Sequence, residues 1–257
     1  MRRRTRRALL GAAAVPVMAI AVLGAEVQMA RSAKNLPDDT PLVLDGHLDG
    51  PGAPLRMLWL GDSTAAGLGA STANQTVPRR VAAALHRQVD LISLATSGHR
   101  IGDVLTFQLG RVAALHPDVV LISIGANDVV HLTSKTTFRH EYERFVQGLP
   151  AGVRLVILGV PDMGATTRFA QPLRAIAGWR GRVLDSVSRS VAKAYGAIYV
   201  DIAGTTGPVM RRDTHRYFAA DHYHPNDAGY GLWADAVLAR LRPALATATE
   251  GVIHGHR

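Results

Sequence analysis

Short apolar runs recur along most of the chain, and longer stretches with a helical pattern separate them. Each run holds four to eight mostly apolar residues, which is typical of strands that are covered on both faces of a sheet. The predicted strands are Met57–Leu60, Val89–Leu94, Val119–Ile124, Val153–Val160 and Ala197–Ile202.

The stretches between these runs have the apolar spacing of amphipathic helices. They cover Val81–Arg87, Ile101–Leu115, Phe138–Leu149 and Leu173–Tyr195. The longest stretch repeats apolar residues at intervals of three, four and seven, which places them on one helix face. These residues are Leu173, Ile176, Val183, Val187 and Val191. A proline favours the first position of a helix, so Pro225 is placed to open a final helix. Its inner face would carry Leu232, Val237, Leu238 and Leu241.

The alternation of strands and helices continues from residue 55 to residue 245 without an internal repeat. Alternating strands and helices predict an α/β fold, in which a parallel sheet is flanked by helices. We expect one domain over residues 55–245, because a chain of 257 residues can bury a sizeable core as a single unit.

The first 25 residues have the pattern of an export signal or a membrane anchor. Five arginines lie within the first seven residues, and the uncharged apolar stretch Ala8–Ala25 follows them. Eighteen residues form a helix of roughly 27 Å, close to the thickness of a bilayer core. Cleavage after Gly24 or after Ser32 would leave small residues at the recognition positions. Whether the segment is cleaved or kept, we expect the folded part to lie outside the cytoplasm, extracellular or in the cell envelope.

Residues 26–54 are dense in proline, glycine and aspartate, so we predict a linker with little regular structure. Residues 246–257 are predicted to form a C-terminal tail.

Composition removes several classes of function. The absence of cysteine excludes disulfides, thiolate metal sites and a thiol nucleophile. The net charge of +9 falls to +4 without the five leading arginines (9 − 5), and the other basic residues are scattered. Aromatic residues make up only 5% of the chain, which is low for base stacking. We therefore predict no nucleic-acid partner.

Glycines and polar residues follow several of the predicted strands. The first strand leads into Gly61-Asp62-Ser63, the second into Ser97-Gly98 and the third into Gly125-Ala126-Asn127-Asp128. After the fifth strand and a loop comes Asp221, followed by His224-Pro225-Asn226. In open α/β sheets, ligands bind at the carboxyl ends of the strands, so these motifs are candidates for one site.

Together these motifs resemble those of the SGNH hydrolases, also called GDSL esterases and lipases. They occur in the family's order and span residues 61 to 226, nearly the whole predicted domain. The second motif departs from the common family pattern, because no asparagine lies shortly before Gly98. The resemblance implies a flavodoxin-like, three-layer α/β/α fold with a five-stranded parallel sheet. It also implies hydrolysis of an ester or thioester through an acyl-serine intermediate.

The resemblance implies a role for five residues. Ser63 would be the nucleophile, His224 its base, and Asp221 the group that orients the imidazole. The backbone N–H groups of Ser63 and Gly98 and the side-chain amide of Asn127 would form the oxyanion hole.

Three of these five residues also have a plainer interpretation. Ser63 could cap a helix, Gly98 could be an ordinary loop glycine, and Asn127 with Asp128 could close a turn. Asp62 is expected to brace the turn beside Ser63 rather than to carry a proton.

A metal site is the other interpretation of the last motif, because Asp221, His222 and His224 are common zinc ligands. No further cluster of ligands stands out in the sequence, so we predict neither metal nor cofactor.

The expected substrate is a small or lipid-like acyl ester. Val129, Val130 and Leu132 favour contact with an acyl chain, and His99 and His131 are placed to line the cleft. Two alternatives stay open: an acyltransferase that acts on cell-envelope acceptors, and a non-catalytic binding module. The sequence also leaves open membrane association through residues 8–25, the oligomeric state, the acyl length and the alcohol or thiol part of the substrate, so that a thioesterase, a short-chain esterase, a lipase and a carbohydrate deacetylase all stay open.

Overall fold

The computed structural model of the chain describes residues 22–29, 32, 36–37 and 41–253. Within these residues, one sheet contains β1 (Gly46–Leu48), β2 (Leu55–Gly61), β3 (Val89–Ser93), β4 (Val119–Ser123), β5 (Arg154–Leu158) and β6 (Ile198–Val200). The strand order is β1-β3-β2-β4-β5-β6. Strands β2 to β6 run parallel, whereas β1 pairs antiparallel with β3. The predicted α/β fold with a largely parallel sheet is confirmed.

The parallel strands have the flavodoxin-like order that the sequence motifs implied. The prediction of five strands lacks the edge strand β1, which lies within the range predicted to be a linker. Three residues between glycines and prolines are too few to show a strand pattern. The pairing of β1 with β3 extends from Gly46 opposite Leu91 to Leu48 opposite Val89.

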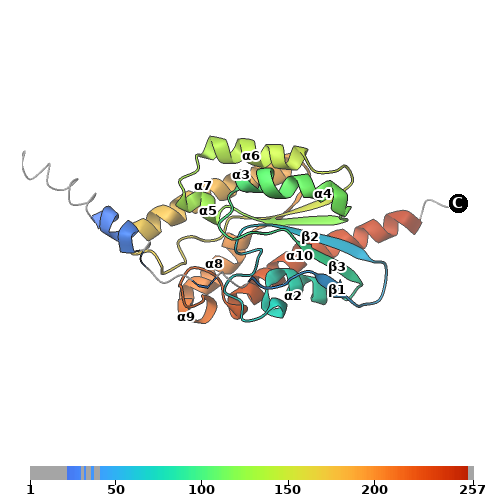
Figure 1. Cartoon of the computed structure of the whole chain (residues 1–257), viewed down its shortest axis with the longest axis horizontal. Coiled ribbons are helices and arrows are strands. Elements are labelled where there is room, and N and C mark those ends of the chain that lie inside the picture. Colours follow the sequence, from blue (N-terminus) through green and yellow to red (C-terminus); the bar gives the residue numbers. More distant parts are fainter. Residues whose placement is uncertain (1–21, 30–31, 33–35, 38–40, 254–257) are drawn as a thin grey trace, which may run out of the picture.

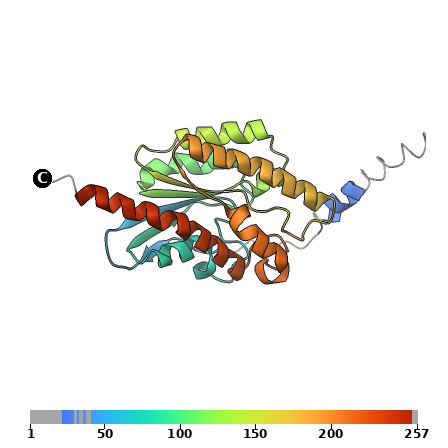
Figure 2. The same cartoon turned by 180° about the vertical axis from the view of Figure 1, so that it is seen from behind.

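Helices cover both faces of the sheet, which gives three layers (Figures 1 and 2). One face carries α2 (Val77–Ala84), α8 (Ile202–Arg212), α9 (Thr214–Tyr217) and α10 (Asp227–Ile253). The other face carries α3 (Ile101–Asp103), the π-helical turn η2 (Val104–Gln108), α4 (Leu109–Leu115), α5 (Ala126–Val130), α6 (Lys135–Gln147) and α7 (Leu173–Ala194). The helices α7 and α10 are the longest and lie on opposite faces of the sheet (Figure 2).

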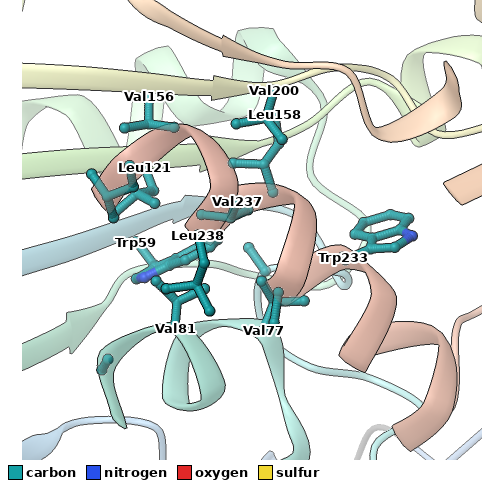
Figure 3. Close-up of a cluster of buried hydrophobic side chains, with 14 of the residues drawn as sticks. Trp59, Val77, Val81, Leu121, Val156, Leu158, Val200, Trp233, Val237 and Leu238 are labelled. Carbon is teal, nitrogen blue, oxygen red and sulfur yellow. The ribbon is translucent and has the colours of Figure 1, made fainter. Parts of the chain in front are cut away.

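Alternate residues of the central strands point into two separate cores. Met57 and Trp59 of β2 are buried with the helices α2 and α10, as Figure 3 shows for Trp59. Leu58 and Leu60 of the same strand are buried with α6 and α7. Because both faces are apolar, these strands appear in the sequence as continuous hydrophobic runs.

Several predicted helices differ in detail from the observed ones. The stretch predicted as Val81–Arg87 is observed as α2, Val77–Ala84, and the one predicted as Phe138–Leu149 as α6, Lys135–Gln147. The stretch Ile101–Leu115 is helical throughout but contains the π-helical turn η2. The final helix begins at Asp227 rather than at Pro225, because Asn226 caps it: its Oδ1 accepts from the N–H groups of Ala228 and Gly229 at 3.0 and 3.2 Å. The short helices α5, α8 and α9 were not predicted.

Most of the predicted export signal or anchor, residues 1–25, lies outside the described residues. Its last four residues belong to a helical segment, residues 22–29. At the other end, α10 continues to Ile253, through most of the predicted tail. In the part of the chain that the structure describes, no helix is both long enough and apolar enough to cross a membrane.

Candidate active site

Ser63 lies at the carboxyl edge of the sheet, two residues after the end of β2. Residues 63–69 form turns rather than a helix, so Ser63 is not a helix cap. Gly61 allows the chain to leave β2 in this way, because its φ of 131° strongly favours glycine. A Cβ at this position would also lie 1.9 Å from the carbonyl oxygen of Ser123 on the neighbouring strand. The geometry of the turn therefore depends on glycine at position 61.

Asp62 braces the turn that presents Ser63. Its Oδ1 accepts hydrogen bonds from the backbone N–H and the Oγ1 of Thr64, at 2.9 and 2.7 Å. The Thr64 hydroxyl is also 2.8 Å from the Oγ of Ser123, which ties the turn to β4. Burial raises the pKa of Asp62 to about 6, although the hydrogen bonds from Thr64 act to lower it. These contacts agree with the bracing role expected from the sequence.

Ser63, His224 and Asp221 form one hydrogen-bonded chain. The Oγ of Ser63 is 2.9 Å from Nε2 of His224, and Nδ1 of His224 is 2.6 Å from Oδ2 of Asp221. An ionised carboxylate can only accept, so Nδ1 donates to Asp221, and Nε2 of the neutral ring accepts from Ser63. This arrangement can move a proton from the serine hydroxyl to the imidazole.

A tight loop holds Asp221 and His224 in place. Oδ1 of Asp221 accepts from the backbone N–H groups of Tyr223 and His224 at 3.0 and 3.1 Å. Burial acts to raise the pKa of Asp221, but the hydrogen bond from the His224 ring and the two backbone hydrogen bonds outweigh it, so the pKa lies below its usual value. Asp221 is therefore ionised when it faces the imidazole near neutral pH.

Gly98 lies on the loop after β3, and Asn127 lies in α5, which follows β4; both line the same cleft as Ser63. Gly98 has a φ of 81°, and a Cβ there would face open space. The Nδ2 of Asn127 donates to the carbonyl oxygen of His99 at 3.0 Å. An amide NH₂ carries two donors, so this bond orients the group and leaves a second N–H for a ligand. The structure brings all five predicted site residues to one edge of the sheet.

Gln108 connects the turn at Gly61 with the loop that contains His99. The sequence did not point to this residue. It is 2% exposed and lies at the end of the π-helical turn η2. Its Oε1 accepts from the N–H of Gly61 at 2.9 Å, and its Nε2 donates to the Gly61 carbonyl at 2.8 Å. The same Nε2 is 2.9 Å from Nδ1 of His99. π-Helical turns are frequent at functional sites, but nothing in the local sequence marks a glutamine for this position.

Asp128 is a structural residue behind the site. It is fully buried, its Oδ2 accepts from the N–H of Ile101 at 3.2 Å, and its Oδ1 has no hydrogen-bond partner among the described residues. Burial raises the pKa of Asp128 to about 6. The carboxylate is therefore ionised near neutral pH at a cost to the stability of the folded protein.

We expect Asp128→Asn to become more stable relative to the wild type as the pH rises. Burial raises the pKa of Asp128 from its ordinary value of 3.8 to about 6 in the fold, and a difference of about 2 in pKa corresponds to about 3 kcal/mol. A raised acid pKa stabilises the fold at low pH, and that stability is lost as the pH rises through the folded value. Urea unfolding at pH 4 and pH 8 measures the difference in stability between Asp128→Asn and the wild type. Asp235 is exposed, so Asp235→Asn is the control, and its stability difference from the wild type should be the same at both pH values. A constant stability difference between Asp128→Asn and the wild type would contradict the argument.

A cleft with a volume of about 650 Å³ opens beside Ser63 and His224. Most of its walls are apolar and come from α5, α7 and the segment before α7. They include Val129, Val130, Leu132, Phe169, Leu173, Ile176 and Ala177. His131 also lines the cleft, as expected. His99, which was expected there too, is not among the lining residues; instead its carbonyl accepts from Asn127. Leu132 is 69% exposed, so the apolar lining reaches the surface.

The structure does not support the interpretation of the last motif as a metal site. Both nitrogens of His224 are engaged, and His222 packs against His215 with the ring centroids 6.0 Å apart. Across residues 22–29, 32, 36–37 and 41–253, no three histidine, aspartate or glutamate side chains are grouped so as to hold a metal ion.

Comparisons with known proteins identify similar proteins over the region that contains these site residues. Residues 59–232 match the model of the GDSL-like lipase/acylhydrolase family. A GDSL-like esterase of Mycobacterium tuberculosis is 30% identical over 277 aligned residues, which cover 99% of this chain and 88% of the relative. An acetylxylan esterase of Geobacillus stearothermophilus is 25% identical over 165 residues, which cover 60% of this chain and 72% of the relative. The crystal structure of a lipase/acylhydrolase from Enterococcus faecalis superposes with a TM-score of 0.60 at 22% identity, over 74% of this chain and 96% of that one.

Proposed function

We propose a mechanism for this chain from the premise that it belongs to the GDSL-like lipase/acylhydrolase family and is an ester hydrolase. In this mechanism the chain cleaves acyl esters through an acyl-serine intermediate on Ser63. The Oγ of Ser63 bonds to the ester carbonyl carbon while His224 takes the hydroxyl proton. The bond to the alcohol oxygen then breaks, and His224 returns the proton to that oxygen. A water molecule, activated by His224, hydrolyses the acyl-serine and releases the acid.

The observation that carries this proposal is the hydrogen-bonded chain from Ser63 through His224 to Asp221, which opens on the cleft. Asp221 would fix the proton on Nδ1 and stabilise the imidazolium that forms during the attack. The carboxylate holds that position through its own bonds to the backbone of the loop.

Gly98, Asn127 and the backbone N–H of Ser63 would stabilise the negative charge on the carbonyl oxygen in the transition state. Support comes from their common place beside the cleft and from the hydrogen bond that orients the Asn127 amide. Losing one donor of this kind costs about 2.7–4 kcal/mol of transition-state stabilisation.

The apolar walls of the cleft favour a substrate with an acyl chain longer than acetate. Small-molecule pockets usually combine apolar walls with a few polar groups that fix orientation, and here the polar lining includes Ser63 and His224 together with two arginines, Arg168 and Arg180. We propose lipid-like carboxylic esters as the substrate class.

The first 25 residues support a place of action outside the cytoplasm, in the cell envelope or beyond it. Cell fractionation of the tagged full chain tests this, and recovery of the folded enzyme in the cytoplasm would reject it.

Labelling with a serine-directed phosphonate tests the mechanism. We expect one adduct per chain, located on the peptide that contains Ser63, together with hydrolysis of nitrophenyl esters. Product analysis distinguishes hydrolysis from acyl transfer, because a hydrolase releases free acid whereas a transferase forms an acylated acceptor. An intact chain that neither reacts with the phosphonate nor cleaves an ester would be a binding module instead.

Gln108→Met is expected to lower kcat by about 10- to 100-fold with little change in KM. The variant keeps the side-chain volume but removes the bonds to Gly61 and His99, and errors of about 1 Å in a catalytic group can cost about 100-fold. Kinetics in an Asn127→Ala background provide the check. The effect of Gln108→Met should shrink there, because part of it passes through the His99 carbonyl to Asn127. Full additivity of the two effects would contradict this role.

A further inference from the structure

The helical segment of residues 22–29 lies against the first turn of α7 (Figures 1 and 2). Glu26 makes the connecting contact: its Oε2 accepts from the backbone N–H of Leu173 at 2.9 Å. Glu26 is only 6% exposed. Carboxylates are seldom buried without a partner, and the N–H of Leu173 is the partner here. The contact joins positions 147 residues apart in the sequence.

The start of α7 needs a partner of this kind. The first N–H groups of a helix have no acceptor within the helix. Groups just before α7 accept from the N–H groups of Arg174 and Ala175, whereas Pro172 at the cap position makes no side-chain cap bond. Glu26 therefore supplies the acceptor for one remaining group, the N–H of Leu173, and a carboxylate charge is favourable at a helix N-terminus.

The same N-terminal segment forms part of the cleft wall. Val27, next to Glu26, and Leu36 line the cleft that contains Ser63 and His224. Leu173 and Ile176 of α7 line it as well. The cleft thus extends from the catalytic serine to the place where Glu26 holds the N-terminal segment against α7.

We propose that Val27, Leu36 and the first turns of α7 form a subsite for the distal part of a medium or long acyl chain, with Glu26 as its positioning residue. This inference rests on the proposed ester hydrolysis at Ser63. An acyl group as short as acetate would occupy only the part of the cleft beside Ser63 and would not reach Val27. The N-terminal segment therefore selects for acyl length, although its sequence suggests only a leader and a linker.

Processing of the N-terminus would then alter specificity. A cut after Gly24 keeps Glu26 and Val27, whereas a cut after Ser32 removes both and opens this side of the cleft.

Point variants of the full chain test the subsite with nitrophenyl acetate and nitrophenyl octanoate. We expect Glu26→Ala and Val27→Asp to lower kcat/KM for octanoate by about ten-fold, the effect of losing apolar contacts in a pocket. Hydrolysis of acetate should stay within about two-fold of the wild type. Glu26→Gln should restore octanoate hydrolysis, because its side-chain oxygen can still accept from Leu173.

Two control variants match these changes away from the cleft. Glu143→Ala removes a glutamate on α6, and Val43→Asp places a charge at a valine that is 79% exposed. Both should keep the wild-type ratio of octanoate to acetate hydrolysis.

The results separate this inference from the proposed function. Equal losses with both esters, or an unchanged ratio in Glu26→Ala and Val27→Asp, would overturn the subsite while Ser63 still reacts with the phosphonate. A wild type that cleaves neither ester and is not labelled at Ser63 would overturn both proposals.

Discussion

Replacing Asp221 with asparagine is expected to lower kcat by about 10⁴-fold while the protein stays folded. The structure dictates how the new amide is oriented. The backbone N–H groups of Tyr223 and His224 both donate to Oδ1 of Asp221, so the amide oxygen must take this position. The NH₂ group then faces Nδ1 of His224, where Oδ2 of Asp221 lies in the wild type.

An amide donor at that position reverses the tautomer of His224. Nδ1 must accept, so the proton of the neutral ring moves to Nε2, the nitrogen that faces Ser63. The imidazole can then no longer take the proton of the serine hydroxyl. The loss is expected in kcat rather than in KM, because Asp221 forms its hydrogen bonds with other groups of the protein and not with the substrate.

Steady-state kinetics and a thermal melt of Asp221→Asn measure the two quantities. Asp213→Asn is the matched control, because Asp213 accepts from the N–H of Arg216 at the start of α9 and asparagine caps helices equally well. The control should keep kcat within about two-fold of the wild type. A kcat within ten-fold of the wild type for Asp221→Asn would reject the orienting role of Asp221.

The sequence predicted the parts of the site that follow strand ends. A strand buried on both faces appears as an unbroken apolar run, so its last residue can be located, and the position of the next polar residue at the sheet edge follows. Ser63 after β2 and Asn127 after β4 are placed in this way. Asp221 and His224 are close in sequence, so their contact is local and was also predictable.

The supporting contacts could not be predicted, because they depend on tertiary packing. Gln108 reaches Gly61 across 47 residues, and Glu26 reaches Leu173 across 147 residues. Glutamine in a helix and glutamate before a proline-rich segment are ordinary in sequence. Only the π-helical turn η2 and the docking of residues 22–29 on α7 give them a position beside the site.

The edge strand β1 escaped prediction for a different reason. Its residues Gly46–Leu48 are too few for a period, and the surrounding breakers suggest a linker. The partner strand β3 supplies the acceptors and donors that make it a strand. Short helices such as α5 likewise depend on the sheet edge that they follow rather than on their own propensity.

Replacing Ser63 with alanine is expected to have the largest effect, a loss of kcat of about 10⁵-fold or more. The variant removes the only atom that can form the acyl bond in the proposed mechanism, while the cleft and the oxyanion donors remain. Nitrophenyl ester hydrolysis and phosphonate labelling should disappear together. Ser97→Ala is the informative comparison, because Ser97 also lines the cleft, whereas the hydroxyl that bonds to Nε2 of His224 is that of Ser63. It should remain active and become labelled.

The double variant Ser63→Ala/His224→Ala tests whether the two residues act as one unit. Without the serine hydroxyl, His224 has no proton to take, so removing the ring should cause little further loss. The single variants and the double variant should then share one residual rate, maintained by Gly98, Asn127 and binding in the cleft. Losses that multiply in the double variant would show that His224 acts independently of Ser63. Full activity in Ser63→Ala, combined with inactivity in Ser97→Ala, would move the nucleophile to the loop after β3.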